Sequence, residues 1–142
     1  MLVRLLYASR AAQPHTQALL DNILAQSHHN NPPRGITGLL CYSGDVFMPV
    51  LEGGRKEVCD LYHRIAADTR HTGVELLQLE EIDQRRFANW TMGQVNMARV
   101  NPSLLLRYSE KAQLDPFAMS GKASMALLQE LIDSAAIIGR PG

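Results

Sequence analysis

Apolar and polar positions along the chain predict a mixed α/β domain. Residues 3–8 alternate with the period of a β-strand, whereas residues 14–27 and 55–67 carry apolar side chains at helical spacing. Pro14 suits the first position of a helix, because that position needs no backbone N–H donor. The polar stretch at 28–35, "HHNNPPRG", contains two prolines and a glycine and therefore predicts a loop after the first helix.

Four more apolar runs predict the remaining strands. The runs at 36–42 and 45–51 flank a Ser-Gly turn and favour a β-hairpin, and the runs at 74–82 and 90–97 follow the second helix. The resulting order, β-α-β-β-α-β with one extra strand, predicts a ferredoxin-like α+β sandwich in which two helices cover one face of an antiparallel sheet. The first and third strands of such a sandwich lie in the middle of the sheet.

The third predicted strand contains a proline where a central strand needs a donor. Pro49 lies within "FMPVLEG" at 47–53, and proline is normally confined to edge strands, strand starts and bulges. Its missing N–H leaves a neighbouring carbonyl without a partner, at a cost of about 1–3 kcal/mol that a bulge or a water molecule relieves in part.

The last third of the chain predicts a helical extension. A short helix is expected near 103–111 and a longer one over 120–139. We therefore divide the chain into a domain at 1–97 and an extension at 98–142. An apolar stripe on the longer helix contains Met125, Leu128, Leu131, Ile132, Ala135 and Ile138. Because this stripe needs cover, we expect it to dock on the sheet face that the other helices leave open, and we expect a homo-oligomer.

Composition narrows the class of protein. The 142 residues are 46% hydrophobic with a net charge of +0, which fits one domain and disfavours a nucleic-acid or membrane-surface protein. No apolar run approaches the ~18–20 residues that span a bilayer, and the N-terminus lacks the pattern of a signal peptide. Cys41 and Cys59 are too few for a disulfide framework. These features together indicate a cytoplasmic protein.

Candidate enzymatic chemistry is sparse. The five histidines form no metal-binding motif, so we expect no metal. Ser9 and Ser43 lack the GxSxG context of a hydrolase nucleophile, and Cys41 and Cys59 are expected to be buried as small apolar residues. The sequence contains neither a Walker motif nor a GxGxxG loop. We therefore do not expect an enzyme.

Several residues allow two interpretations. Tyr7 ends the first strand on its core-facing side, where a tyrosine with a bonded hydroxyl is the simplest interpretation. Asn30 and Asn31 are first interpreted as turn formers after a helix. Trp90 and Met92 share one face of the last predicted strand and would ordinarily fill the core.

Five stretches, taken together, change this picture. They are "YASR" (7–10), "NNPPRGITGLLCYSGDVF" (30–47), "VLEG" (50–53), "YHRIAADTRH" (62–71) and "RRFANWTMG" (85–93). In this order and spacing they closely resemble the BLUF family, whose members are flavin-binding sensors of blue light. The resemblance covers about residues 1–97. The extension resembles that of short, stand-alone members, which lack a fused enzymatic domain and signal through partner proteins.

The resemblance implies a flavin between the two helices and the sheet, with FAD as the expected cofactor and FMN as the other candidate. A tyrosine matching Tyr7 gives an electron and then a proton to the excited flavin. An asparagine matching Asn31, beside Asn30, holds the polar edge of the ring, and Ile23 packs on its face. The ribityl-phosphate side is lined by residues matching Arg64, Asp68, Arg70 and His71. The other photochemical residues that the resemblance implies are Ser9 and the signal-relaying pair Trp90 and Met92.

One position departs from the family pattern. The family has a glutamine in the third strand that bridges the tyrosine and the flavin, and Pro49 takes its place here. Because proline has no side-chain donor or acceptor, the resemblance implies a photoreceptor whose normal photocycle is disabled or altered. The alternative is a light-independent protein-interaction module on the same scaffold. A small ferredoxin-like enzyme such as an acylphosphatase is disfavoured, because no phosphate-binding glycine loop is present.

Overall fold

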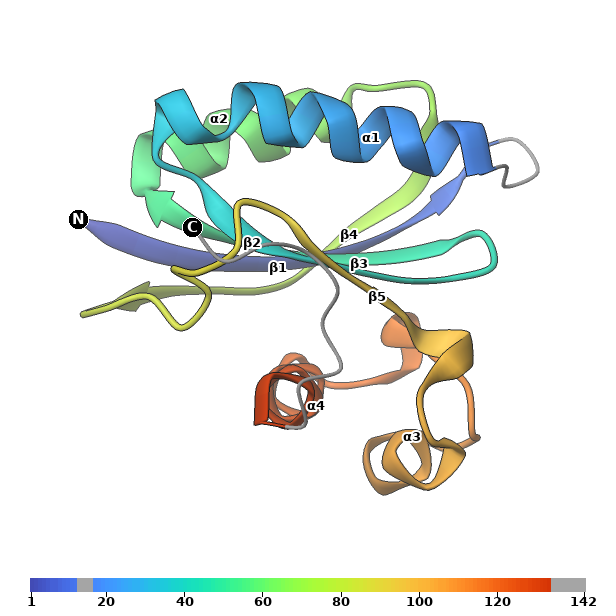
Figure 1. Cartoon of the computed structure of the whole chain (residues 1–142). Coiled ribbons are helices and arrows are strands. Elements are labelled where there is room, and N and C mark those ends of the chain that lie inside the picture. Colours follow the sequence, from blue (N-terminus) through green and yellow to red (C-terminus); the bar gives the residue numbers. More distant parts are fainter. Residues whose placement is uncertain (13–16, 134–142) are drawn as a thin grey trace.

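A five-stranded sheet lies between two layers of helices (Figure 1). The computed structural model describes residues 1–12 and 17–133. The strands are β1 (Leu2–Ala11), β2 (Thr37–Ser43), β3 (Val46–Gly54), β4 (His71–Ile82) and β5 (Gly93–Asn96). The α-helices are α1 (Gln17–Asn30), α2 (Arg55–Ala66), α3 (Pro102–Tyr108) and α4 (Gly121–Asp133). Short 3-10 helices are η1 (Pro32–Arg34), η2 (Met97–Arg99) and η3 (Pro116–Ala118).

The strand order confirms the ferredoxin-like prediction. The order is β4-β1-β3-β2-β5, so β1 and β3 are paired on both sides, and α1 and α2 cover one face (Figure 1). One detail of the prediction is wrong. The added strand β5 runs parallel to β2, which makes the sheet mixed rather than wholly antiparallel.

Alternation along β1 divides the buried side chains into two cores. Val3, Leu5 and Tyr7 belong to what we call the helix-side core, together with apolar residues of α1 and α2. Leu6 points the other way, into what we call the far-side core. Because successive side chains of a strand point to opposite faces, a single strand supplies both cores.

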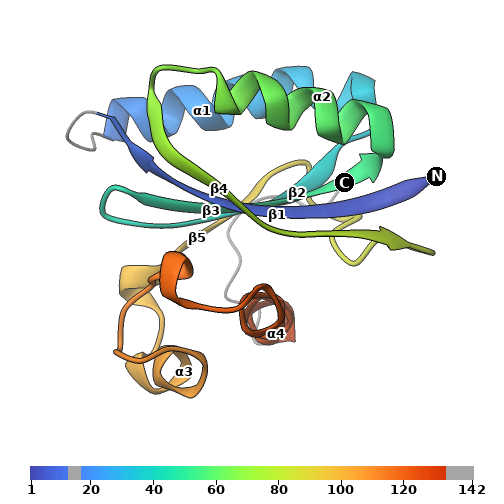
Figure 2. The same cartoon turned by 180° about the vertical axis from the view of Figure 1, so that it is seen from behind.

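The extension docks on the far face of the sheet, as expected (Figure 2). Leu128 and Leu131 of the predicted stripe are fully buried in the far-side core, and Leu127 joins them. The stripe residues Ala135 and Ile138 lie outside the described residues. The far-side core thus crosses the boundary that we placed between 97 and 98, and the division into two domains stays a prediction.

Gly121 lets α4 approach the sheet closely. A Cβ atom built at this position would lie 2.6 Å from the carbonyl oxygen of Leu77 in β4, which is closer than real contacts allow. Glycine is used where two backbones must come together. The first residue of α4 therefore rests directly on β4.

Pro49 lies in the interior of the sheet, as predicted, with β2 paired without interruption on one side. Toward β1, Leu6 pairs with Val50. The next pair is Ser9 with Phe47, so two pairs are missing although both strands are described throughout. The missing pairs are those that an N–H at residue 49 would complete. The β1–β3 register is unchanged across the gap, so this pair of strands loses pairing without a β-bulge. Against β4, in contrast, β1 shifts its register between Leu6 and Tyr7 and between Ala8 and Arg10.

Two element boundaries differ from the prediction. Helix α1 continues through Asn30 instead of ending near Ser27. Asn31, the residue before Pro32, also has helical dihedral angles (φ −76°, ψ −41°), so the chain passes from α1 into η1 without an extended residue between them. Strand β5 begins at Gly93, so residues 90–92 of the strand predicted at 90–97 belong to the irregular connection before it. The predicted first helical residue, Pro14, lies outside the described residues.

Candidate functional site

A cavity of about 200 Å³ opens between α1, α2 and the helix side of the sheet. It gathers most of the residues that the sequence singled out. Those in its wall are Tyr7, Ile23, Asn30, Asn31, Pro49, Arg64, Asp68, Arg70, His71 and Met92. The other two candidates, Ser9 and Trp90, lie outside the wall.

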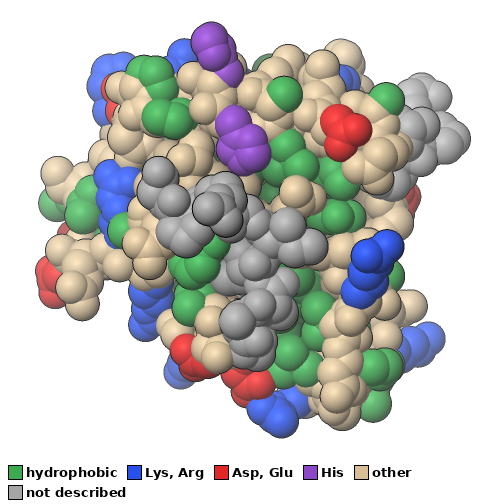
Figure 3. Space-filling model, viewed as in Figure 1, with side chains coloured by type: hydrophobic (Ala, Val, Ile, Leu, Met, Phe, Trp, Pro, Cys, Tyr) green, Lys and Arg blue, Asp and Glu red, His purple; other side chains and the backbone are tan. Residues whose placement is uncertain are grey.

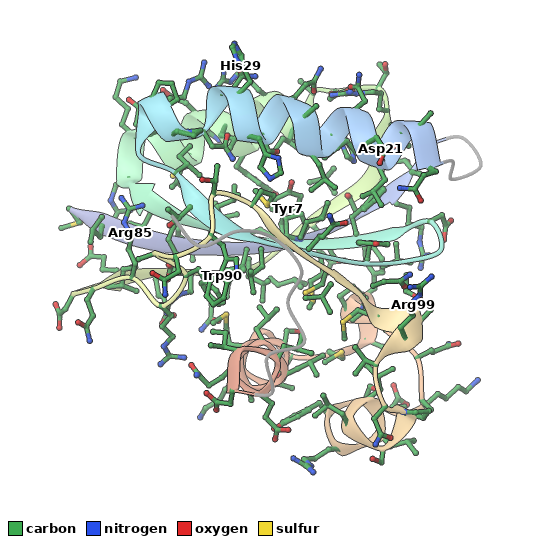
Figure 4. The ribbon with its side chains drawn as sticks, viewed as in Figure 1. Tyr7, Asp21, His29, Arg85, Trp90 and Arg99 are labelled. Atoms are coloured by element: carbon green, nitrogen blue, oxygen red, sulfur yellow. The ribbon has the colours of Figure 1, made fainter. Side chains whose placement is uncertain are left out.

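Tyr7 faces this cavity from β1, between the sheet and the helices (Figure 4). It is 3% exposed, and its ring meets the ring of Tyr62 edge-on at a centroid distance of 5.4 Å. Among the described residues no protein group bonds its hydroxyl, so the bonded core tyrosine of the simplest interpretation is not found. Burial first, and then Tyr62, raise the pKa of Tyr7. The phenol therefore keeps its proton and offers an O–H donor to the cavity.

Asn31 is both a turn former and a candidate ligand residue. Its carbonyl accepts hydrogen bonds from the backbone N–H groups of Arg34 and Ile36, both at 3.0 Å. Its side chain is 2% exposed, and its Nδ2 has no partner in the described part of the chain. Leaving a buried donor unpaired costs about 1–3 kcal/mol. The amide is therefore available to a ligand, whereas Asn30 beside it is exposed at the rim.

The arginines around the cavity fall into two groups. Arg64 and Arg34 line the cavity and make no ion pair with any residue that the structure describes. Arg70 is engaged, because its Nε and one Nη bond the Asp68 carboxylate at 2.6–3.1 Å. Its Nη atoms also reach the side-chain oxygens of two α1 residues, Asn22 at 2.9 Å and Gln26 at 3.1 Å.

Arg70 therefore clamps α1 to the turn after α2. The hydrogen bond from Arg70 holds the pKa of Asp68 below its usual range, so the carboxylate stays charged. Arg34 and Arg64, in contrast, keep positive charge free at the cavity. Sequence reasoning placed Arg70 and Arg64 in one group, because the spacing of charges does not reveal which guanidinium already has a partner.

Ser9 contacts His71, a residue of the cavity wall. Its hydroxyl oxygen is 3.4 Å from His71 Nδ1, and the His71 ring meets Phe47 edge-on at 5.9 Å. Burial is the main cause that lowers the pKa of His71. The imidazole is thus held neutral in the wall of the cavity, with Ser9 behind it.

Trp90 and Met92 face opposite sides of the sheet, which corrects the prediction that they share one face. Met92 belongs to the helix-side core and lines the cavity. Trp90 packs against the far-side core, on the side of α4 (Figure 4). Residues two positions apart share a face in a regular strand. Trp90 and Met92 precede β5 and follow an irregular path, so this rule does not hold for them.

Glu52 fixes that segment from the far side. Its fully buried carboxylate accepts hydrogen bonds from the backbone N–H of Arg86 at 3.0 Å and of Phe87 at 2.7 Å. Arg4 Nε lies 2.8 Å from the same carboxylate. Arg4 also pairs with Glu80 at 2.8 Å. The loop that leads to Trp90 and Met92 is therefore tied to β3 by two hydrogen bonds to Glu52, whose charge is paired with that of Arg4.

Pro49 lies in the cavity wall opposite Tyr7. The β1–β3 register on both sides of the gap, Leu6 with Val50 and Ser9 with Phe47, places residue 49 across from residue 7. Both belong to the helix side of the sheet. The side chain nearest to Tyr7 on the neighbouring strand is thus an apolar ring without a donor or acceptor.

Sequence reasoning missed several residues of the wall. Arg34 lies in the wall, and Tyr62 packs against Tyr7 of the wall. Both lie within stretches that carried the resemblance, yet neither was selected as a site residue. Helical spacing could have identified Leu61, because Leu61, Arg64 and Ile65 share one face of α2. Contacts between residues far apart in the chain, such as the ring contact of Tyr62 with Tyr7, cannot be inferred from local spacing.

Comparison with known proteins decides the family. The family described as "BLUF: Sensors of blue-light using FAD" matches residues 2–93. The chain belongs to the BLUF family. Its relatives include the photoactivated adenylate cyclase subunit beta of Euglena longa, which is 34% identical over 92 residues. That match covers 64% of the chain and 11% of the cyclase subunit, so the chain spans about a tenth of this relative's length.

Two solved BLUF structures resemble nearly the whole chain. The structure titled "BlsA photo-activated state" has a TM-score of 0.82 at 29% identity and covers 93% of this chain and 95% of its own. The structure titled "BlrB - a BLUF protein, dark state structure" has a TM-score of 0.78 at 32% identity and covers 94% and 96%. The extension is therefore part of the likeness, which goes beyond the family match.

The cavity of this BLUF domain fits a flavin. An isoalloxazine ring is flat and apolar on its faces and carries hydrogen-bond acceptors along one edge. Ile23, Leu40 and Phe47 supply apolar wall, and the unpartnered Asn31 amide supplies a donor. Arg64 supplies positive charge for a phosphate. Each part of the group thus meets a side chain of matching chemistry.

Other site chemistries find no support in the residues that the structure describes. They contain no group of three or more potential metal ligands, and none of their helices is long and apolar enough to cross a membrane. Cys41 is buried, which raises the pKa of its thiol to about 12, whereas Cys59 is half-buried. Figure 3 shows acidic and basic side chains interspersed over one face of the molecule.

Proposed function

We propose that this chain binds a flavin in the cavity and serves in the sensing of blue light. One observation carries the proposal. The Asn31 amide is a buried donor without a protein partner, and it lies in the wall of a cavity that Tyr7 also lines. Buried polar groups are ordinarily hydrogen-bonded, so this pair of side chains indicates a polar ligand.

The wall residues suggest how the flavin would lie. Asn31 would hold the polar edge of the ring, and Ile23 would pack on its face. Arg64, together with Arg34, would meet the phosphate side, since neither guanidinium group is paired with a carboxylate of residues 1–12 or 17–133. We propose FAD as the cofactor, as the family description states, with FMN as the second candidate.

The photochemistry rests on Tyr7 and residue 49. A bound flavin supplies the absorption of blue light. Tyr7, whose phenol is neutral, would give up an electron and then its proton toward the cavity. Pro49 cannot exchange hydrogen bonds with Tyr7, because it has neither donor nor acceptor in its side chain. We therefore propose that the normal photocycle is disabled or altered.

A second candidate function is a light-independent interaction module on the same scaffold. The observation that favours it is Pro49 itself, since the chain keeps the cavity and changes the residue opposite Tyr7. In either case we propose a sensor or binding role rather than catalysis. A homo-oligomer, a downstream signalling protein and the reducing cytoplasm stay predictions.

Two measurements separate the candidates. The first is the flavin released on denaturing the purified chain, which we expect near one per chain and without a covalent bond. If no flavin is released and the chain does not reconstitute with FAD, the proposal is contradicted. The second is a difference spectrum before and after blue light. A lasting change of any kind supports a sensor, and its absence favours the light-independent module.

A further inference from the structure

The segment that carries Trp90 and Met92 is held in the middle by the sheet. The N–H of Gly38 donates to the Trp90 carbonyl at 2.9 Å. On the far side, the Glu52 carboxylate holds the loop before it through two backbone N–H groups. Just after Met92, Gly93 pairs with Leu39 of β2. All of these contacts come from the sheet or its far side, so an attachment to the helix layer needs another contact.

His28 supplies that third attachment, from the helix layer. Its Nε2 lies 3.2 Å from the Met92 carbonyl oxygen. A carbonyl oxygen only accepts, so His28 Nε2 carries the proton and donates. The two residues are 64 positions apart in the chain. The contact therefore joins two elements that the sequence does not bring together.

The contact joins two walls of one cavity. His28 lies in the last turn of α1, which supplies Ile23 and Asn30 to the wall, and Asn31 follows directly after the helix. Met92 supplies the wall from the other direction, and two residues earlier Trp90 enters the far-side core. A shift of α1 is thus passed to the backbone on which both side chains stand.

We infer that His28 is a positioning residue, which fastens the Trp90–Met92 segment to α1 and so joins the cavity wall to the far-side core. The neighbouring His29 provides the contrast, since it points away from the sheet and makes no hydrogen bond with the residues that the structure describes (Figure 4). The part of the inference that concerns ligand affinity rests on the proposed flavin site. The part that concerns the segment does not.

The first experiment follows the segment without reference to a ligand. Hydrogen–deuterium exchange of peptides covering residues 88–96 is measured in the full chain for His28→Ala, His28→Gln and His29→Ala. The loss of one hydrogen bond is expected to speed exchange by about two- to tenfold in His28→Ala. His28→Gln keeps an N–H donor at similar reach and should restore the slow rate, and His29→Ala should leave it unchanged.

Trp90 gives a second signal from the same variants. It is the sole tryptophan of the chain, so quenching of its fluorescence by acrylamide reports on this segment alone. Quenching should rise in His28→Ala and stay unchanged in His29→Ala. Equal exchange in all three variants, or equal effects of both alanine substitutions, would overturn the positioning role.

Titration with FMN tests the link to the site. His28→Ala is expected to weaken FMN binding by about two- to tenfold, with His28→Gln and His29→Ala near the parent value. Unchanged FMN affinity in His28→Ala would overturn the link between the two walls. If FMN and FAD bind to none of the four proteins, the proposed function fails, and the exchange rates still decide whether His28 positions the segment.

Discussion

The two faces of the sheet differ in the surroundings of their buried polar groups. On the far side, the charges of Arg4 and Glu52 are buried and lie 2.8 Å apart, and two backbone N–H groups complete the carboxylate. On the helix side, the Asn31 amide is buried without a protein partner among the described residues, and Tyr7 lines the cavity beside it. Two buried atoms elsewhere also lack a partner, Gln78 Oε1 in β4 and Ser124 Oγ in α4, but neither residue lines the cavity. An unpaired group therefore indicates a ligand only at Asn31, where a cavity adjoins it.

Strand β3 serves both faces. Glu52 points to the far side and ties down the loop that leads to Met92. Pro49, three residues earlier, points into the cavity. A change at Glu52 should therefore act on stability and a change at Pro49 on the response to light. Four variants test this division of roles.

The largest effect is expected from removing the extension. A chain that ends at residue 100 uncovers the far-side core. Each fully buried large apolar side chain contributes about 1.5–3 kcal/mol, so the loss of six is comparable to the stability of a domain. The six are Leu105, Leu114, Met125, Leu127, Leu128 and Leu131. We expect aggregation or a larger assembly, measured by light scattering.

The matched control is a chain that ends at residue 133, which keeps the described part of α4. It should behave like the parent if the described part of α4 provides the cover. A truncation at 100 that stays soluble with the parent's oligomer size would show that α4 does not cover the sheet in solution.

Glu52→Ala should have the next largest effect. It removes the acceptor of two buried N–H groups and leaves Arg4 without its buried partner. Breaking a buried ion pair from one side typically costs 3–5 kcal/mol, and we expect about that loss in urea unfolding. Glu81→Ala is the control, because its ion pair with Arg55 is exposed and should contribute about 0–1 kcal/mol. Similar losses in both variants would show that burial of the pair is not decisive.

Local patterns predicted the architecture well and the connections poorly. Alternation within the first strand placed Tyr7 on the helix side, and the order of the elements made β3 a central strand despite Pro49. The opposite facing of Trp90 and Met92 was not predicted, because Glu52 and Gly38 fix that segment from distant parts of the chain.

The same limit applies to the site. Its residue set followed from the family resemblance, and ten of the twelve positions line the cavity. Periodicity alone gave Tyr7 a core role and Asn31 a turn role. Only the structure shows that the Asn31 amide lacks a partner and that the Arg70 guanidinium has three.

Asn31→Ala tests the unpaired group on the helix side. We expect flavin affinity to fall by about 1–3 kcal/mol, because the ring edge loses its buried donor. The turn should survive, since the Asn31 backbone makes its bonds to Ser27, Arg34 and Ile36 without the side chain. Asn30→Ala is the control at the exposed rim. Equal flavin titrations for parent and Asn31→Ala would assign this asparagine to the turn alone.

The smallest change in stability, and the most informative change in spectrum, is expected from Pro49→Gln. The new N–H can restore the missing pairs between β1 and β3, which adds about 0.5–1.5 kcal/mol. Losing proline also frees the unfolded chain, which removes about 0.4–1 kcal/mol. The two contributions nearly offset, so the free energy of unfolding measured in urea should change by about 1 kcal/mol or less.

The difference spectrum then separates the backbone from the side chain at position 49. Pro49→Leu restores the N–H and adds no amide, whereas Pro49→Gln restores both. If the amide opposite Tyr7 is what the photocycle needs, Pro49→Gln alone gains a persistent, reversible red shift after blue light, and the parent and Pro49→Leu show none. A red shift in Pro49→Leu would assign the defect to the gap in the β1–β3 ladder. A red shift of ordinary size in the parent would move the switching role to another residue, such as Asn30 or Met48, since the wall opposite Tyr7 would then work without an amide.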